Sequence, residues 1–494
     1  MKKIILTLLL ILTLALAACS STISTQTAAT GAASSQTTAT AQPTTASDVN
    51  VPPGAVNPPA GTPPSGGAGG NPPAGAPPAG GTGNSDTSTG LASATGAYTQ
   101  NSGTASLTNQ TYTASDADES AILVTDGSTL TLTDSTIKTS GNTSSQDDSS
   151  FYGLNAGVLA TSGSTINISD STIATTGTGA NGVFATGSGS SVNLTNVTIN
   201  TTADGAHAVM ATQGGTMTIT NVDMTTTGGS SSTIATDRGG GTITVIGGTV
   251  TTSGMNSAGI YSTGDITVTN GKFIANGAEA AVIEGGNSIT LTDTSLTSNM
   301  AGKWGAMIYQ SMSGDAQGTK GTFTMTGGSL AYTATDGPLF YVTNSTGVIT
   351  LKGVSIAAAS GNLINAAAGN WGSIGSNGGT VILTTDGQTL AGNLIADSIS
   401  SITATLQNGS SLTGAINSGN SARAMNLTLD ASSTWTVTAD SYLTCLTDTG
   451  GVSGTTITNI NGNGHIVYYD KSACPALGGQ IYTLDGGGVL KPVN

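Results

Sequence analysis

Few residues of this sequence have the types and spacing that chemistry requires. Asp237 and Arg238 form an adjacent acid–base pair, and His207 and His465 are the two histidines of the chain. A carboxylate and a base that flank one bond can carry out general acid–base chemistry. Motifs this short also occur in ordinary surface loops, and a surface loop is the favoured interpretation of each.

Glu284 is a further candidate. In an alignment by eye, Glu284 falls at the position of Ala160, Ala185 and Ala211, where small residues prevail. A carboxylate buried at such a position would have a raised pKa and could act in catalysis. The favoured alternative is that Glu284 lies in a turn at the end of a strand, exposed to solvent. A second acidic pair, Asp147-Asp148, lies in a polar insert and is also interpreted as surface.

The remaining patterns argue against a metal, a nucleotide or a nucleic acid as ligand. No set of Cys and His has metal-ligand spacing, and neither a calcium-binding glycine–aspartate repeat nor a glycine-rich phosphate loop occurs. Charged residues make up 7% of the chain, the formal net charge is −15, and the only arginines are Arg238 and Arg423. A nucleic-acid-binding protein needs a concentrated basic surface. The sequence therefore predicts no catalytic residue, no metal site, no cofactor and no nucleic-acid partner.

The N-terminus indicates export. Lys2 and Lys3 precede an apolar stretch from Ile4 to Ala18, which is typical of a signal peptide over residues 1–18. Leu16-Ala17-Ala18-Cys19 resembles the bacterial lipobox, which implies that Cys19 is lipidated and anchors the chain to a membrane. The alternative is an ordinary signal peptide with an incidental cysteine. Ser20 after Cys19 favours the outer membrane if the bacterium has one, with the rest of the chain exposed at the cell surface.

Residues 19–95 differ in composition from the rest of the chain. They are rich in Ser, Thr, Pro and Gly, and Asp48 and Asp86 are the only ionisable side chains between Ser20 and Thr95. Such a segment cannot bury enough apolar area to offset the entropy of ordering, which predicts a disordered stalk.

A repeat begins near residue 96. Its template is Φ-T-Φ-T-(D/N/G)-x-(T/S)-Φ, where Φ is apolar, and copies begin at residues 130, 166, 192, 217, 243, 266, 289, 323 and 349. Alternation with a period of two places Leu130, Leu132 and Ile137 on one side. Because one repeat cannot bury this side alone, the repeats are expected to stack as a parallel β-solenoid of about a dozen turns. The Asp, Asn or Gly at the fifth template position fits a corner with left-handed backbone.

The repeat resembles the right-handed parallel β-helix shared by pectate-lyase-like enzymes, autotransporter passenger domains and adhesin-like bacterial surface proteins. The resemblance covers residues 96–430 and implies an all-β, single-stranded helix. Residues 431–494 hold several aromatic residues and are expected to form a C-terminal β cap over the open end of the solenoid. In an exported chain Cys445 and Cys474 would form a disulfide there, the alternative being two buried free thiols.

Two surface features of the solenoid bear on binding. Trp304, Tyr309, Tyr341 and Trp371 fall on successive repeats and are the best candidates for a glycan-binding patch, because aromatic rings stack on sugars; packing in the core or at corners is the alternative. Thr-x-Thr pairs, broken at Asn167/Ser169, Ile246 and Lys352, resemble the surface of ice-binding solenoids. Threonine is also the usual filler of an exposed strand face.

These observations favour a non-enzymatic, adhesin-like or polysaccharide-binding lipoprotein that presents a rigid β-helix at the cell surface. Its partners would be the membrane, through the lipid, and a polysaccharide, cell-wall or host-surface ligand. One alternative is a polysaccharide lyase or glycoside hydrolase, which requires a carboxylate cluster with a nearby Arg or Lys. The other alternative is an ice-binding protein, which requires an unbroken threonine face.

Overall fold

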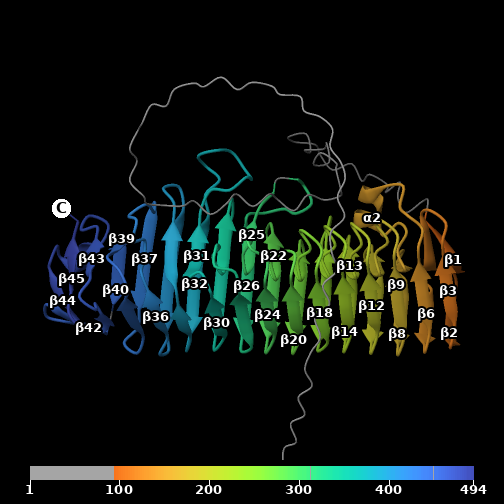
Figure 1. Ribbon diagram of the computed structural model, residues 1–494, viewed down its shortest axis with the longest axis horizontal. Helices are drawn as coiled ribbons and strands as arrows, with labels where there is room; N and C mark the ends of the chain where they lie inside the picture. The colour runs from red at the N-terminus through yellow and green to blue at the C-terminus, as the bar shows by residue number, and fades with distance from the viewer. Residues whose placement is uncertain (1–93, 312, 449, 494) are drawn as a thin grey trace, which may run out of the picture. The chain divides into compact units, whose positions relative to one another are not determined.

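The computed structural model describes residues 94–311, 313–448 and 450–493, so the predicted signal peptide, Cys19 and all but the last two residues of the predicted stalk lie outside the described residues. The described chain is a parallel β-solenoid (Figure 1), as the repeat predicted. Through most of its length each turn contributes one strand to each of three sheets, A, B and C, and sheet D takes the place of sheet C after β30. No helix in the described residues is long and apolar enough to span a membrane.

The strands of sheet A are β1 (Thr95–Gln100), β4 (Glu119–Val124), β7 (Val158–Ala160), β10 (Val183–Thr186), β13 (Val209–Thr212), β16 (Ile234–Thr236), β19 (Ile260–Ser262), β22 (Ala281–Glu284), β25 (Ala306–Tyr309), β28 (Phe340–Thr343), β31 (Asn362–Ala366) and β34 (Asn393–Ala396). Those of sheet B are β2 (Thr104–Thr108), β5 (Thr129–Thr133), β8 (Thr165–Ser169), β11 (Ser191–Thr195), β14 (Gly215–Thr220), β17 (Gly241–Ile246), β20 (Asp265–Thr269), β23 (Ser288–Thr292), β26 (Lys320–Thr326), β29 (Thr346–Lys352), β32 (Thr380–Asp386), β35 (Ser401–Gln407), β37 (Ala424–Leu429) and β40 (Cys445–Asp448).

Sheet C contains β3 (Thr111–Ala114), β6 (Thr136–Thr139), β9 (Thr172–Thr175), β12 (Thr198–Thr201), β15 (Asp223–Thr226), β18 (Thr249–Thr252), β21 (Lys272–Ala275), β24 (Ser295–Ser298), β27 (Ser329–Tyr332) and β30 (Ser355–Ala358). Sheet D contains β33 (Thr389–Ala391), β36 (Ser411–Gly414), β38 (Thr434–Val437), β39 (Ser441–Leu443), β41 (Val452–Ser453), β42 (Thr456–Asn461), β43 (Ile466–Tyr469), β44 (Tyr482–Asp485) and β45 (Val489–Pro492). The helices are α2 (Gln146–Tyr152) and the 3-10 turn η1 (Pro475–Leu477).

The apolar template positions line the interior. Leu130, Leu132 and Ile137 are fully buried, and the next copy pairs with them in register, Ile166 beside Leu130 and Ile168 beside Leu132. Each strand thus buries its inward face in the interior of the solenoid, where its side chains stack on those of the adjacent turns. Its backbone forms hydrogen bonds to the strands of the turns before and after it. The predicted alternation is confirmed.

The predicted corners are also confirmed. The fifth template position has a positive φ in every copy, from 47° at Asp293 to 71° at Gly247. Asp, Asn and Gly adopt this left-handed conformation at the lowest cost, which explains their choice at the turn from sheet B to sheet C. Side chains at these corners also bond between turns, since Asn196 Nδ2 donates to Asp170 Oδ1 at 3.1 Å.

The solenoid has about 16 turns rather than the dozen expected. Sheet B alone has 14 strands, which at the usual strand spacing of about 4.8 Å extends roughly 60 Å. Beyond residue 357 the repeat weakens: β32, β35 and β37 keep the alternation of buried and more exposed positions, but of the three only β35 keeps a Thr-x-Thr pair, Thr403 and Thr405.

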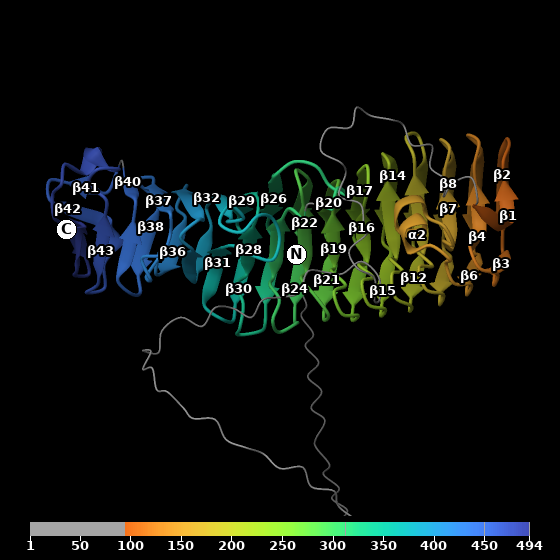
Figure 2. The same ribbon diagram turned by 90° about the horizontal axis from the view of Figure 1, so that it is seen from above.

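The outer face of sheet A is covered over most of its length, from β4 to β28, whereas the outer faces of sheets B and C are open to solvent. Strands β10, β13, β22, β25 and β28 are buried at every position, while those of sheets B and C alternate between buried and exposed. The helix α2 lies over sheet A (Figure 2). Phe151 of α2 accepts a hydrogen bond at its carbonyl from Thr212 Oγ1 of β13, at 2.8 Å. The connections β25–β26 and β31–β32 supply further contacts to this face.

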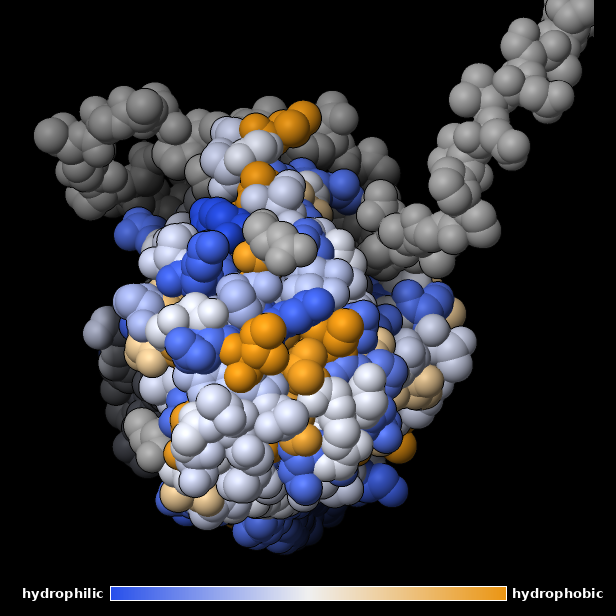
Figure 3. Space-filling view, turned by 90° about the vertical axis from the view of Figure 1, so that its left-hand side faces the viewer, coloured by the Kyte–Doolittle hydropathy of each residue, from blue (hydrophilic) through white to orange (hydrophobic). Residues whose placement is uncertain are grey.

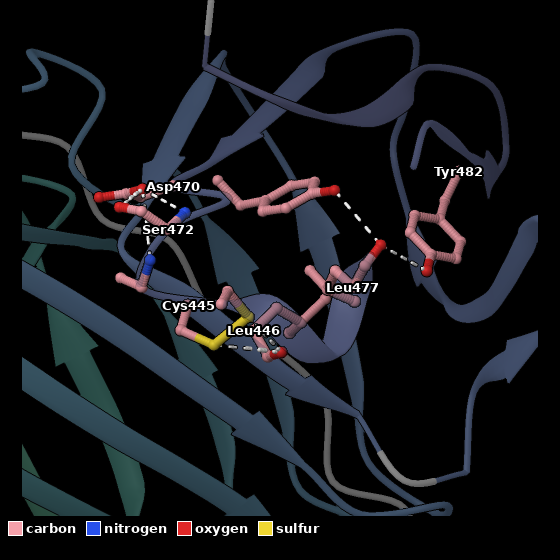
Figure 4. The surroundings of a disulfide bond; sticks show 9 residues. Cys445, Leu446, Asp470, Ser472, Leu477 and Tyr482 are labelled. Carbon is pink, nitrogen blue, oxygen red and sulfur yellow. Dashed lines mark hydrogen bonds between the residues drawn. A yellow bond between two sulfur atoms is a disulfide. The ribbon is translucent and has the colours of Figure 1, made fainter. Parts of the chain in front are cut away.

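At the C-terminal end of the solenoid the strands pair in both parallel and antiparallel orientation. Strand β44 is parallel to β42 and antiparallel to β45, and β45 is parallel to β43. Apolar side chains gather on this end (Figure 3), where Ile481 and Val493 are exposed. The predicted disulfide between Cys445 and Cys474 is confirmed (Figure 4) and joins β40 to the turn before η1.

Candidate functional site

The polar residues with the most unusual environments lie on the covered face of sheet A. The register corrects the alignment by eye: Ala281 pairs with Ile260, and this column continues through Ile234 and Val209. Ile283, and not Glu284, therefore shares the inward-facing column of the small residues. Because a shift of one residue moves a strand side chain to the opposite face, Glu284 points outward. Its predicted exposure at a turn is nevertheless wrong, since Glu284 is 2% exposed.

Glu284 is surrounded by hydroxyl groups. Tyr309 Oη donates to Glu284 Oε2 at 2.8 Å, and Tyr261 Oη donates to the same oxygen. Ser311 Oγ donates to Oε1, and Ser313 Oγ donates to it at 3.4 Å. The buried carboxylate is therefore satisfied by protein donors from the two neighbouring turns of the solenoid, that of β19 and that of β25 with its following connection.

Asp237 and Arg238 lie beside this group and extend it. Arg238 Nη2 donates to Asp315 Oδ1 at 2.9 Å, and the guanidinium carbon lies 3.9 Å from the ring centre of Phe151. Arg238 thus joins α2 to the connection β25–β26. Burial raises the pKa of Asp237 well above its ordinary value, and the charges of Asp315 and Glu284 raise it further. We call Asp237, Glu284, Asp315, Tyr261 and Tyr309 the acid–tyrosine cluster.

The two tyrosines of the acid–tyrosine cluster act as hydrogen-bond donors. Burial raises the pKa of both Tyr261 and Tyr309 well above the ordinary value, and the charge of Glu284 raises it further. Both phenols therefore stay protonated at neutral pH. The acid–tyrosine cluster contains carboxyl and phenol groups of the kinds used in acid–base chemistry. However, the Glu284 carboxylate already accepts hydrogen bonds from protein hydroxyls, and the Arg238 guanidinium already forms an ion pair with Asp315.

The four residues predicted as a glycan-binding patch come together on the same face. The rings of Trp304 and Tyr341 are stacked with centres 4.3 Å apart, and those of Tyr309 and Trp371 are tilted with centres 4.7 Å apart. All four are at most 7% exposed. A sugar could stack on a ring only if the covering connections moved, so the glycan-binding role of these residues stays a prediction.

The other residues considered in the sequence, Asp147, Asp148, His207 and His465, interact with neighbouring protein groups rather than forming a site. Asp147 and Asp148 lie in the first turn of α2, where negative charges interact favourably with the positive end of the helix dipole. His465 Nδ1 lies 3.7 Å from Asp440 Oδ1. His207 is partly buried rather than in an exposed loop, and its Nδ1 lies 3.0 Å from the carbonyl oxygen of Ser232.

His207 is expected to make stability depend on pH. Burial lowers the pKa of His207 to about 4, although the Ser232 carbonyl partly offsets this effect. The unfolded chain takes up the proton near pH 6.5 and the folded chain only near pH 4, so the free energy of unfolding falls as the pH drops through this window. The loss due to His207 should be about 3 kcal/mol. Urea unfolding of wild type and of His207→Gln, each near neutral pH and near pH 4, measures this loss of unfolding free energy. If both proteins lost the same amount between the two pH values, the loss could not be due to His207.

The open face of sheet B carries a different kind of array. The middle outward position of the strands is threonine in ten successive turns, which pair in register. These residues are Thr218, Thr244, Thr267, Thr290, Thr324, Thr350, Thr384, Thr405, Thr428 and Thr447. We call them the threonine column. Ile246 and Lys352, which appeared to break the pattern, belong to the neighbouring column, beside Thr220 and Thr326.

No group of three or more His, Cys, Asp or Glu side chains in the described residues is placed to hold a metal ion. Sequence reasoning selected Asp237, Arg238 and Glu284 but missed Tyr261, Ser311 and Asp315, because no motif links side chains on different turns. A tyrosine that replaces the apolar outward residue of a sheet A strand, as Tyr261 does beside Ala235, is the one signal available in the sequence.

The geometry is the guide to function, because comparison with family models and with curated proteins finds no match to this chain.

Proposed function

We propose that this chain is a surface-anchored, non-enzymatic protein whose solenoid binds extended polysaccharide along the open face of sheet B. The lipid anchor and the cell-surface location rest on Leu16–Cys19 and belong to the proposal. The observation that carries it is the threonine column, which repeats one neutral polar group at every turn across ten turns.

The chemistry of the column suits a neutral sugar polymer. Each threonine hydroxyl both donates and accepts hydrogen bonds, as sugar hydroxyls do, and its methyl group offers apolar contact. Uncharged hydroxyls lose less on desolvation than ion pairs do. A polymer that lies along the solenoid axis meets the same group at each turn of about 4.8 Å, so weak contacts add up through multivalency.

The test removes hydroxyls without changing strand shape. In the triple variant Thr290→Val, Thr324→Val and Thr350→Val, β-branched side chains remain on three adjacent turns. Losing three hydrogen bonds of about 1 kcal/mol each should weaken binding to insoluble cellulose, chitin or peptidoglycan at least about tenfold in a sedimentation assay. The matched control is the triple variant Thr225→Val, Thr251→Val and Thr297→Val on the outer face of sheet C, which should bind as wild type does.

Equal binding by the sheet B and sheet C variants would overturn the proposal, as would the absence of wild-type binding to all three polymers. The same protein should be assayed for depression of the freezing point below the melting point. A freezing effect that the sheet B variant loses, without polymer binding, would reassign the face to ice.

A second candidate function is uronate-polymer cleavage, favoured by the carboxylates of Asp237, Asp315 and Glu284 beside Arg238. Against it, Arg238 is bound by Asp315 and Glu284 is bound by hydroxyls. Turnover of a uronate polymer that disappears in Asp237→Asn would favour the enzyme over the binding protein.

A further inference from the structure

A cavity of about 450 Å³ lies near the C-terminal end of the solenoid, where the turn after Ile416 and strand β39 follow β34, the last strand of sheet A. Its walls come from three segments: the turn with Asn417 and Asn420, the strand β39 with Tyr442, and the turn with Asp470 and Lys471. Arg423 also lines it. Cavities of this size accommodate small organic ligands, including one or two sugar units.

The cations at this cavity are unusual in a chain with a net charge of −15. Within the described residues only Arg238, Lys303 and Lys352 have carboxylate partners within 4.0 Å. Arg423 and Lys471 are among the six cations of this part of the chain that have none, and these two line one cavity. Arg423 Nη2 donates only to Ser401 Oγ, at 3.2 Å. Two exposed cations that face one cavity attract an anion.

The one carboxylate in the wall is used by its own turn. Asp470 Oδ1 accepts hydrogen bonds from the backbone N–H of Ser472 at 2.8 Å and from Ser472 Oγ at 2.6 Å. These bonds lower the pKa of Asp470 and hold the turn that carries Lys471 (Figure 4). The Asp470 charge is thus directed at the backbone of the turn.

An aromatic platform adjoins the cations. Tyr442, Tyr468 and Lys491 pair in register on β39, β43 and β45. The rings of Tyr442 and Tyr468 are stacked with centres 4.7 Å apart and planes 8° apart, and Lys491 Nζ lies 5.2 Å from the centre of the Tyr468 ring. Unlike the covered rings on sheet A, both tyrosines are partly exposed. Aromatic rings of this kind pack on the apolar face of a sugar ring.

The disulfide holds the two sides of the cavity together. Cys445 directly follows Thr444, and Cys474 lies two residues after Ser472; both Thr444 and Ser472 line the cavity. Asn417 supports the third side, because its Oδ1 accepts from the backbone of Ser421 at 2.9 Å and its Nδ2 donates to the carbonyl of Tyr442 at 3.2 Å. The site is therefore preorganised, which lowers the cost of binding.

We propose that this cavity binds a carboxylated saccharide. The sugar ring packs on Tyr442, the carboxylate pairs with Arg423 and Lys471, and the exposed amide of Asn420 borders the sugar hydroxyls. This inference extends the proposed polysaccharide-binding function but uses a different surface, so each can fail alone.

The test is calorimetric titration of the purified protein with tetragalacturonate and with sialyllactose, two sources of a sugar carboxylate. Methyl-esterified tetragalacturonate is the matched ligand without charge. The double variant Arg423→Gln, Lys471→Gln and the single variant Tyr442→Ala should each weaken binding of the charged ligand at least about tenfold. Lys272→Gln, on the exposed side of β21, is the matched control and should bind as wild type does.

Reduction of the disulfide should also weaken binding while the far-ultraviolet circular dichroism of the solenoid persists. Equal binding of the methyl ester, unchanged affinity in the double variant, or no binding of either charged saccharide would overturn the proposal. The sheet B valine variant separates the two hypotheses. It should keep the affinity for tetragalacturonate even where it loses the insoluble polymers.

Discussion

Replacing Glu284 with alanine should lower the free energy of unfolding by about 3–5 kcal/mol. The change removes the acceptor of Tyr261, Tyr309 and Ser311 at a site that is 2% exposed. A buried hydroxyl without a partner has lost its hydrogen bonds to water and gains none from the protein. Hydrogen bonds to a charged group are stronger than those between neutral groups, so their loss costs more. A cavity is also left between sheet A and its cover.

Urea unfolding followed by circular dichroism measures this effect. Glu284→Gln keeps one acceptor oxygen and should lose about half as much. Asp485→Ala is a matched control, because Asp485 is an exposed acidic residue and its loss should change stability by less than about 0.5 kcal/mol. A loss below about 1 kcal/mol in Glu284→Ala would show that the hydroxyls do not depend on this carboxylate.

Trp435→Ala should destabilise the C-terminal turns by about 3–5 kcal/mol. The side chain is fully buried in β38, between Leu412 and Ile460 of the neighbouring strands. Its Nε1 donates to the carbonyl of Gly414 at 2.9 Å, so the change removes a large apolar volume and also leaves a buried acceptor unpaired.

Because a solenoid unfolds in parts, hydrogen exchange is the measurement that localises the effect of Trp435→Ala. Faster exchange should be confined to residues 411–493, and the strands before β30 should exchange as in wild type. Trp435→Phe should have an intermediate effect, and Val493→Ala, at an exposed site, should have none. Uniformly faster exchange from β1 onward would contradict the picture of independently stable turns.

The sequence carried enough information for the fold because the same constraint recurs at every turn. The inward positions must be apolar and the corner must be left-handed, so Ile166 and Asp170 repeat the roles of Leu130 and Asp134. The template fades after residue 357, because β32 and β37 keep the alternation but not the Thr-x-Thr pair. The number of turns was therefore underestimated.

The functional surfaces were less predictable, for a physical reason. Glu284 meets Tyr261 and Ser311 from other turns, and the β25–β26 connection that supplies Ser311 has no counterpart in the repeat. The alignment error at Glu284 was one residue, which in a strand exchanges the inner face for the outer. The second template position already aligns Thr218 through Thr350, but the continuation of the threonine column through Thr384, Thr405, Thr428 and Thr447 follows only from the register.

The regular pairing of turns has a consequence for length. Ile166, Val192, Met217 and Ile243 occupy one column at intervals of 25 or 26 residues, and each contacts only the layers directly before and after. Duplicating or deleting one such segment would lengthen or shorten the rod by a single layer and leave every other layer intact. Unequal recombination can therefore change the length of the binding faces one layer at a time. The insertion of one residue inside a strand would instead turn the inward side chains of that layer outward.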